Sequence, residues 1–205
     1  ASGESQWITS PEARQDVQRL RAQSAAILST SATVLADDPS LTVRWDELDA
    51  ETQRLYPRDN LRQPLRILLD SQNRITPQHR VVQQPGATWL ARLEADEQAW
   101  PQGVEQFICP AHGGGVDLVV MMMLLAKRQV NSIWVEAGAT LAGALLQAGL
   151  VDELILYIAP KLLGDNGRGL CHLPGLERLA DAPEFVFSDV RQVGPDLRLR
   201  LRAKH

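Results

Sequence analysis

Short apolar runs and helical patterns alternate along the chain, which predicts a succession of strands and helices. Near the start, Ser10-Pro11-Glu12 has the form of a helix N-cap, with proline at the first helical position and an acid in the first turn. We expect this helix to run to about Gln23, with Val17 and Leu20 facing inward. Further helices are predicted at 117–129 and 141–148, and strands at 25–28, 65–70, 88–91, 106–109, 132–136, 153–159, 185–190 and 197–202.

Strands separated by helices predict an α/β sandwich with a mostly parallel sheet. The last two strands flank Gly194-Pro195-Asp196 and have the pattern of a hairpin, which would add an antiparallel C-terminal edge. Apolar and basic residues alternate strictly from Leu197 to Arg202. We therefore expect the leucine face of that strand to be buried and its arginines to lie in solvent.

Composition and charge exclude several classes of protein. The 205 residues carry a net charge of −4 and no basic stripe, which argues against nucleic-acid binding. The longest apolar run, from Val116 to Ala126, is too short to span a membrane, and the N-terminal residues lack the features of a secretory signal. The two cysteines, Cys109 and Cys171, make neither a disulfide framework nor a metal cage. These features favour a cytoplasmic protein without a metal site.

A glycine-containing turn follows the strand at 132–136 and gives the best chemical signal. In the segment from Val135 to Gly143, the tight turn Ala137-Gly138-Ala139-Thr140 leads from a buried strand into a helix. The unpaired N–H groups of a helix start favour a phosphate there, so the segment suits a dinucleotide. It is not the G-x-G-x-x-G motif, and the glycines would also be explained by packing of the turn.

Two further segments carry polar groups next to predicted strands. Asp70-Ser71 ends the strand at 65–70, and Ser71 with Arg74 would favour a 2′-phosphorylated cofactor, although a simple turn explains them as well. The polar, irregular stretch at 30–60 contains a loop from Thr33 to Arg44. Arg44 could hold a phosphate there together with Arg21, unless both are ordinary surface arginines.

Three blocks together resemble one known family, the reductase domain of the bifunctional riboflavin-biosynthesis deaminase/reductase. They are Ser2-Gly3-Glu4-Ser5-Gln6-Trp7-Ile8-Thr9, the block from Thr33 to Arg44, and the block from Val135 to Leu146. The likeness looks enterobacterial and continues through Leu150-Val151-Asp152-Glu153 and Ala159–Gly164, so that residues 1–205 read as one reductase domain.

This resemblance implies a dihydrofolate-reductase-like three-layer sandwich, NADPH as the hydride donor, and a homodimer. The implied reaction reduces 5-amino-6-(5-phosphoribosylamino)uracil to its ribitylamino product at the opened ribose C1′. The substrate would be held by Ser5, Arg21, Leu41, Arg44 and Glu136. The cofactor would contact Trp7, Thr33, Asp37, Ser71, Gly138, Ala139, Thr140, Leu141, Ala142, Gly143 and Ala144. Asp37 and Glu136 are the candidates for proton transfer, and hydrogen bonding to ribose hydroxyls is the simpler role for both.

Members of the family open with a strand that ends near a Leu-Asp-Gly sequence, before the Ser2-Gly3-Glu4-Ser5 match. This chain starts at the match, so we expect the first strand and the deaminase half to be absent or supplied by another chain. Two alternatives stay open: a non-catalytic nucleotide-binding or assembly module of the same fold, and a reductase of the dihydrofolate type.

Overall fold

The computed structural model describes residues 8–164, 167 and 169–204, and these form two structural units. Residues 18–137 make up the larger unit, and residues up to 17 together with 138–205 make up the smaller one. Helix α1 (Pro11–Gln23) carries the chain from one to the other. Ser10 caps this helix as predicted, since its Oγ accepts a hydrogen bond from the N–H of Ala13 at 3.2 Å.

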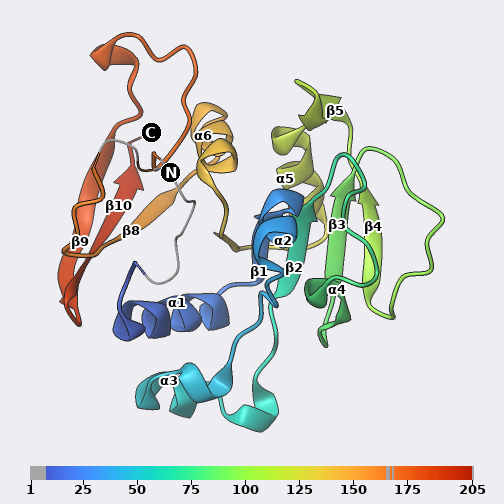
Figure 1. Cartoon of the computed structure of the whole chain (residues 1–205), viewed down its shortest axis with the longest axis horizontal. Helices are drawn as coiled ribbons and strands as arrows, with labels where there is room; N and C mark the ends of the chain where they lie inside the picture. The colour runs from blue at the N-terminus through green and yellow to red at the C-terminus, as the bar shows by residue number, and fades with distance from the viewer. Residues whose placement is uncertain (1–7, 165–166, 168, 205) are drawn as a thin grey trace. The chain divides into compact units, whose positions relative to one another are not determined.

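A five-stranded parallel sheet forms the centre of the larger unit (Figure 1). Its order is β4-β3-β2-β1-β7, and every neighbouring pair is parallel. The strands are β1 (Ala26–Thr30), β2 (Leu65–Leu69), β3 (Thr88–Arg92), β4 (Val104–Ile108) and β7 (Ile133–Val135). Each agrees with its prediction to within about two residues at either end, because these short apolar runs are bounded by turn residues.

Helices and short turns connect these strands. They are α2 (Ser31–Asp37), α3 (Ala50–Leu55), α4 (Arg80–Gln83) and α5 (Leu118–Lys127), with 3-10 turns at Trp45–Glu47 and Arg58–Asn60. A two-stranded ribbon of β5 (Ala111–His112) and β6 (Gly115–Val116) precedes α5. Residues 30–60 are thus partly helical rather than wholly irregular as predicted.

Two layers of side chains cover the parallel sheet. On one face Ile27, Leu68 and Leu90 form a buried core with residues of α2, α4 and the intervening loops. On the other face Trp89 and Phe107 stack, and the guanidinium group of Arg128, which caps the end of α5, lies 4.9 Å from the centre of each ring. The larger unit therefore has helices on both faces of its sheet.

The order of the strands places a switch point between β1 and β7. From β1 the chain moves outward through β2, β3 and β4, and it then returns to place β7 on the opposite side of β1. In open parallel sheets, ligands bind beyond the carboxyl ends of the strands at such a point. The residues that follow β1 and β7 are therefore the ones to inspect for a ligand site.

An antiparallel sheet forms the smaller unit together with α6 (Ala139–Gln147) and a 3-10 turn at Leu179–Asp181. Its order is β8 (Glu153–Ile158), β10 (Asp196–Ala203), β9 (Phe185–Val193). The predicted C-terminal hairpin is present and antiparallel, but it pairs with β8 in a sheet of its own rather than extending the parallel sheet.

The prediction for the two faces of β10 was wrong for Leu197 and Arg198, whereas Arg202 is exposed as predicted. Arg198 is buried, and its guanidinium group donates to Asp16 of α1 at 2.7 Å and to Asp189 of β9 at 2.9 Å. Alternation predicts that the two faces differ, but partners decide which face is covered, and here the carboxylates of Asp16 and Asp189 stabilise the basic face.

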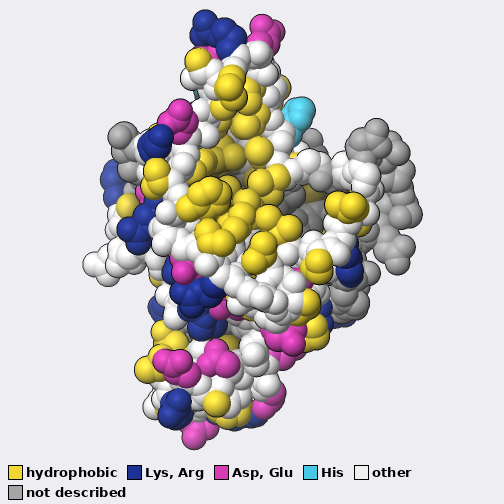
Figure 2. All heavy atoms as spheres, turned by 90° about the vertical axis from the view of Figure 1, so that its left-hand side faces the viewer, with side chains coloured by type: hydrophobic (Ala, Val, Ile, Leu, Met, Phe, Trp, Pro, Cys, Tyr) yellow, Lys and Arg dark blue, Asp and Glu magenta, His cyan; other side chains and the backbone are white. Residues whose placement is uncertain are grey.

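The opposite, apolar face of this sheet is open to solvent in the chain. Leu197 pairs with Ile158 across the sheet, Leu199 pairs with Val190, and Leu201 pairs with Phe187. Of these side chains, Leu197, Ile158, Val190 and Phe187 are exposed by 45% to 65%. Figure 2 shows apolar side chains gathered in one patch on the side of the molecule that carries these strands.

Candidate active site

Glu136 follows β7 at the switch point and is the most heavily bonded candidate residue. Its N–H donates to the carbonyl oxygen of Leu28 in β1 at 2.9 Å, and its own carbonyl oxygen accepts from Ser29 Oγ at 2.7 Å. The side chain of Ser29 is fully buried. The backbone of Glu136 is therefore fixed against β1 on both sides.

The Glu136 carboxylate is held by three N–H donors. Arg21 binds it in a bidentate ion pair, with Nε to Oε1 and Nη2 to Oε2 both at 2.6 Å, and Trp134 Nε1 donates to Oε1 at 2.7 Å. Both members of the ion pair are mostly buried, with side chains 13% and 24% exposed. Such a planar pair fixes the direction of both groups as well as joining them.

Arg21 also reaches the loop that follows α2, because its Nη1 donates to the carbonyl oxygen of Thr42 at 2.9 Å. In that loop Leu41 has φ +49° and a side chain buried in the core, so a ligand could meet it only through its backbone. Arg44 faces solvent and pairs with Glu47, with Nε to Oε1 at 2.5 Å. The structure thus brings Arg21 and Glu136 together, whereas it gives Arg44 a partner of its own.

Helix α2 presents Thr33 and Asp37 beyond the end of β1. Thr30 caps the helix, since its Oγ1 accepts from the N–H of Thr33 at 3.2 Å. Asp37 is exposed in the last turn, where Asp38 closes the helix with φ 39°. The two side chains lie four residues apart in one helix, so they share a face of α2.

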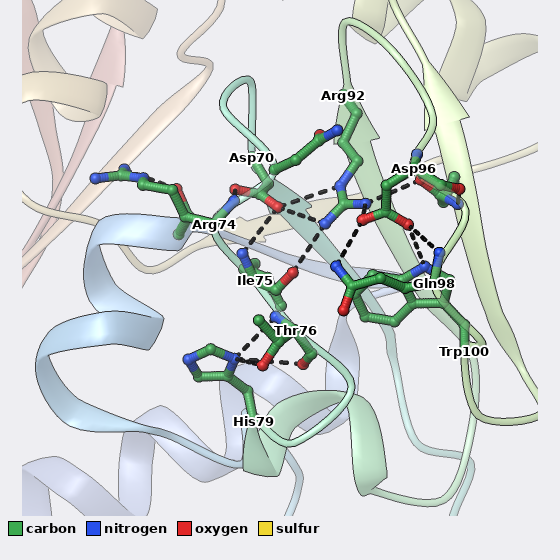
Figure 3. A network of polar contacts seen from close by, with 12 residues as sticks. Asp70, Arg74, Ile75, Thr76, His79, Arg92, Asp96, Gln98 and Trp100 are labelled. Carbon is green, nitrogen blue, oxygen red and sulfur yellow. Dashed lines mark hydrogen bonds and ion pairs between the residues drawn. The ribbon is translucent and has the colours of Figure 1, made fainter.

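The turn after β2 contains the buried polar network of Figure 3. The Asp70 carboxylate accepts from the backbone N–H groups of Arg74 at 2.8 Å and Ile75 at 3.1 Å, and it pairs with Arg92 of β3 at 2.8 Å. Asp70 and Arg92 are both fully buried. For Asp70 the turn explanation is therefore confirmed, because no oxygen of this carboxylate is exposed to a ribose.

Arg92 links Asp70 to a second carboxylate, Asp96, at 2.6 Å. Burial raises the pKa of Asp96, but hydrogen bonds from Trp100 and Arg92 outweigh burial and hold that pKa below its ordinary value. The ring of Trp100 also lies under the Arg92 guanidinium group, 4.9 Å from the ring centre. One arginine thus joins the ends of β2 and β3 and the loop after β3.

Ser71 and Arg74 lie on the outer side of this turn. Ser71 is partly exposed, Arg74 is exposed, and Arg74 Nη2 donates to Ser31 Oγ at 2.8 Å. Ser31 is the first residue of α2 and its side chain is buried. The contact between Arg74 and Ser31 is therefore a link between the ends of β2 and β1.

In the smaller unit, α6 begins at Ala139, so half of the predicted tight turn is helical. Gly138 is the N-cap and supplies no side-chain acceptor for the first N–H groups, and a Cβ placed on it would meet open space. A phosphate group of a dinucleotide fits this helix start, since the N–H groups point outward there. The residues therefore fit the cofactor that the resemblance implies.

Not every residue of the predicted pyrophosphate segment faces outward. Leu141 is buried, and a Cβ on Gly143 would lie 1.8 Å from the carbonyl oxygen of His172. The N–H of His172 in turn donates to the carbonyl oxygen of Ala139 at 2.9 Å. The structure explains Gly143 by close backbone packing, which was the alternative left open for this segment.

Two predicted site residues, Ser5 and Trp7, lie outside the described residues. The sequence did not point to four residues that hold site residues or their turns in place: Trp134, Ser29, Ser31 and Arg92. Trp134 could have been found, because a strand residue two positions before Glu136 points to the same side. Among the described residues, no cluster of three or more metal-ligating side chains occurs, and no helix is long and apolar enough to cross a membrane.

Comparison with known proteins gives a consistent result. Residues 1–199 match the family described as the RibD C-terminal domain. The chain is 71% identical over 201 residues to riboflavin biosynthesis protein RibD of Escherichia coli, covering 98% of this chain and 55% of that protein. It is 41% identical to the 5-amino-6-(5-phosphoribosylamino)uracil reductase of Buchnera aphidicola from Acyrthosiphon pisum, covering 99% of this chain and 98% of that protein.

Solved structures agree with the match in sequence. A structure of Acinetobacter baumannii RibD has a TM-score of 0.79 and 35% identity, and the match covers all of this chain and 54% of that one. The chain thus spans about half the length of the first of these relatives, E. coli RibD, and of this structure. By sequence and by structure, it belongs to the RibD C-terminal domain family.

Proposed function

We propose that this chain is the NADPH-dependent reductase of 5-amino-6-(5-phosphoribosylamino)uracil in riboflavin biosynthesis. The observation that carries the proposal is the buried Arg21–Glu136 pair at the switch point between β1 and β7. Support comes from the family match and from the name of the Buchnera relative, whose whole length the chain nearly covers. We further propose that the chain works in the cytoplasm and corresponds to the reductase part of a longer deaminase/reductase.

Arg21 can hold Glu136 and a substrate phosphate at the same time. A guanidinium group has five N–H donors, and three of those of Arg21 bind Glu136 and Thr42. The remaining two can donate to a phosphate oxygen. Arg44 could also donate to this phosphate after breaking its ion pair with Glu47. Breaking that pair costs little free energy because it is exposed.

Glu136 is suited to accept hydrogen bonds from the sugar of the substrate. Its Oε1 accepts hydrogen bonds from Arg21 and Trp134, whereas Oε2 accepts a hydrogen bond only from Arg21. Oε2 can therefore accept a further hydrogen bond from a hydroxyl group. We assign Glu136 to holding a ribose hydroxyl beside the reacting carbon and stabilising positive charge that develops there. Asp37, which is exposed on α2, is the other candidate for proton transfer during ring opening.

The cofactor, when bound, supplies the hydride that reduces C1′ of the opened ribose. Residues of this chain supply the contacts that hold it. We assign the diphosphate to the first turn of α6, with Gly138, Ala139 and Thr140 offering backbone N–H groups. Thr33 and Asp37 would contact the nicotinamide half, and Ser71 the adenosine half.

The test is an assay with NADPH and the aminouracil substrate, in which loss of reduced nicotinamide is followed by absorbance. The unaltered chain and the variant Glu136→Gln are compared. Glu136→Gln keeps the shape of the side chain but removes its charge, so kcat should fall at least tenfold while NADPH binding is unchanged. The matched control is Glu97→Gln, which alters an exposed carboxylate elsewhere in the same unit. NADPH binding without turnover by the unaltered chain would favour a non-catalytic module, and dihydrofolate turnover would favour the other alternative.

We also propose a homodimer that buries the apolar face of the antiparallel sheet. Arg198 of β10 is buried against Asp16, and on the opposite face Leu197, Val190 and Phe187 are left for a second copy to cover. Leu197→Asp should convert the dimer into a monomer in sedimentation velocity, because a carboxylate would be desolvated in the interface. Leu162→Asp, which changes a fully exposed leucine outside the sheet, should leave the dimer intact. A dimer that survives Leu197→Asp contradicts this assignment.

A further inference from the structure

We propose that Gln63 is a positioning residue for the substrate phosphate, and that it acts by holding the backbone from Thr42 to Arg44 in place. The inference rests on the proposed function, which assigns Arg21 and Arg44 to that phosphate. It adds a residue that touches neither substrate nor cofactor. The starting observation is that side chains bind the backbone of this segment, although the segment belongs to no helix or strand.

Gln63 binds both polar backbone groups of Val43. Its Oε1 accepts a hydrogen bond from the N–H of Val43 at 2.8 Å, and its Nε2 donates to the carbonyl oxygen of Val43 at 2.9 Å. A neighbouring antiparallel strand would bind the two groups of one residue in the same way. The amide of one glutamine side chain therefore takes the place of a strand at this point of the chain.

Helix α1 holds the residues on either side of Val43. Gln18 and Arg21 lie three positions apart in this helix, so they share a face. Gln18 Oε1 accepts from the N–H of Arg44 at 3.0 Å, and Arg21 Nη1 donates to the carbonyl oxygen of Thr42 at 2.9 Å. The side chain of Gln18 is almost fully buried. Three successive residues are thus each bound by a different side chain.

The backbone of Gln63 is itself fixed, because it lies at the start of the central sheet. Pro64 follows it, and proline restricts the conformation of the residue that precedes it. Leu65 is the first residue of β2, and its N–H donates to the carbonyl oxygen of Ala25 at 3.0 Å. Gln63 therefore links the segment that carries Arg44 to the rigid sheet.

A fixed backbone reduces what Arg44 must order when it binds a phosphate. Its backbone is already extended, with φ −98° and ψ 105°, and its guanidinium group is engaged only in the exposed pair with Glu47. Rotation of the side chain is then enough to reach a new partner. Since ordering of side chains and loops opposes binding, loss of the Gln63 amide should weaken the phosphate contact.

Steady-state kinetics of a double-mutant cycle tests the inference. Gln63→Met keeps the length of the side chain and removes both hydrogen bonds, so KM for the aminouracil should rise at least about fivefold, the worth of about one neutral hydrogen bond. The kcat and the affinity for NADPH should stay unchanged. In the background of Arg44→Gln, which itself raises KM, adding Gln63→Met should have little further effect, because Gln63 acts through Arg44.

Three results would overturn the inference. An unchanged KM in Gln63→Met would show that the segment needs no support from Gln63. A full further rise of KM in the Arg44→Gln background, or a parallel loss of NADPH affinity, would show that Gln63 only stabilises the unit. Should Gln63→Met fail to fold, as judged by circular dichroism, Gln63→Asn takes its place in the same cycle, since its amide is too short to bind both groups of Val43.

The matched control is Gln83→Met. Gln83 is an exposed glutamine of α4, and its Nε2 donates to the carbonyl oxygen of Pro77 at 3.1 Å. This substitution also removes a contact between a glutamine amide and the backbone, but far along the chain from the segment at 42–44. It should leave KM, kcat and NADPH affinity unchanged, and a rise in KM equal to that of Gln63→Met would count against the inference.

Turnover by the unaltered chain separates this inference from the proposed function. If the unaltered chain reduces the aminouracil and Gln63→Met has the same KM, the inference fails and the function stands. If the unaltered chain binds the aminouracil without reducing it, the function fails. The same cycle, measured as dissociation constants by calorimetry, then decides the inference.

Discussion

Replacing Arg92 by methionine tests how the end of the parallel sheet is held together. Arg92 is fully buried, and it donates hydrogen bonds to Asp70, Asp96, Gln106 and the carbonyl oxygen of Ile75. Methionine keeps much of the aliphatic volume but supplies none of these donors. The substitution therefore leaves the Asp70 carboxylate buried with only two backbone N–H partners.

The expected loss of free energy of unfolding follows from that uncompensated charge. Removing one partner of a buried ion pair typically costs about 3–5 kcal/mol. An exposed pair is worth about 0–1 kcal/mol, so Arg44→Met, which breaks the exposed pair with Glu47, is the control. Combining Arg92→Met with Asp70→Asn should recover part of the loss, because an amide is less costly to bury than a carboxylate.

Urea unfolding followed by tryptophan fluorescence measures the effect. Trp100 is one of the five tryptophans that give this signal, and its environment depends on Arg92, because its ring stacks under the Arg92 guanidinium group and its Nε1 donates to Asp96 at 2.9 Å. We expect the free energy of unfolding to fall by about 3–5 kcal/mol in Arg92→Met and by less than about 1 kcal/mol in Arg44→Met. Equal losses in the two variants would show that burial does not make the Arg92 pair more important than an exposed pair.

Two further predictions concern packing and thiol chemistry. Gly143→Ala should lower the melting temperature, because its Cβ would clash with the backbone of His172. Gly138→Ala should leave the melting temperature unchanged, because its Cβ would meet open space. Equal melting temperatures of the two variants would contradict this packing. Burial raises the pKa of the Cys109 thiol to about 11, so at pH 8 the thiolate is scarce in the folded chain. A chromogenic disulfide reagent should therefore modify Cys171 before Cys109 in the folded chain. Unfolding in urea should make Cys109 reactive as well. Rapid reaction of both thiols in the folded chain would contradict the burial of Cys109.

The secondary-structure elements and the class of fold could be predicted from the sequence. Short apolar runs bounded by Gly, Pro, Asn and Asp predicted the strands of the parallel sheet, and Ser10-Pro11-Glu12 predicted the start of α1. These signals are local, because side-chain period and capping depend on a few neighbouring residues. The resemblance also indicated the family, and the comparisons confirmed it.

Which polar groups meet depends on contacts between distant segments of the chain. Arg21 and Glu136 are 115 positions apart in the chain, and Asp70 and Arg92 are 22 apart, so no local pattern pairs them. The same holds for the faces of β10, where alternation showed two faces but the carboxylate of Asp16 decided which one is covered. Side-chain period depends on backbone geometry, whereas burial depends on partners that distant segments bring, and this difference separates what the sequence predicts from what the fold decides.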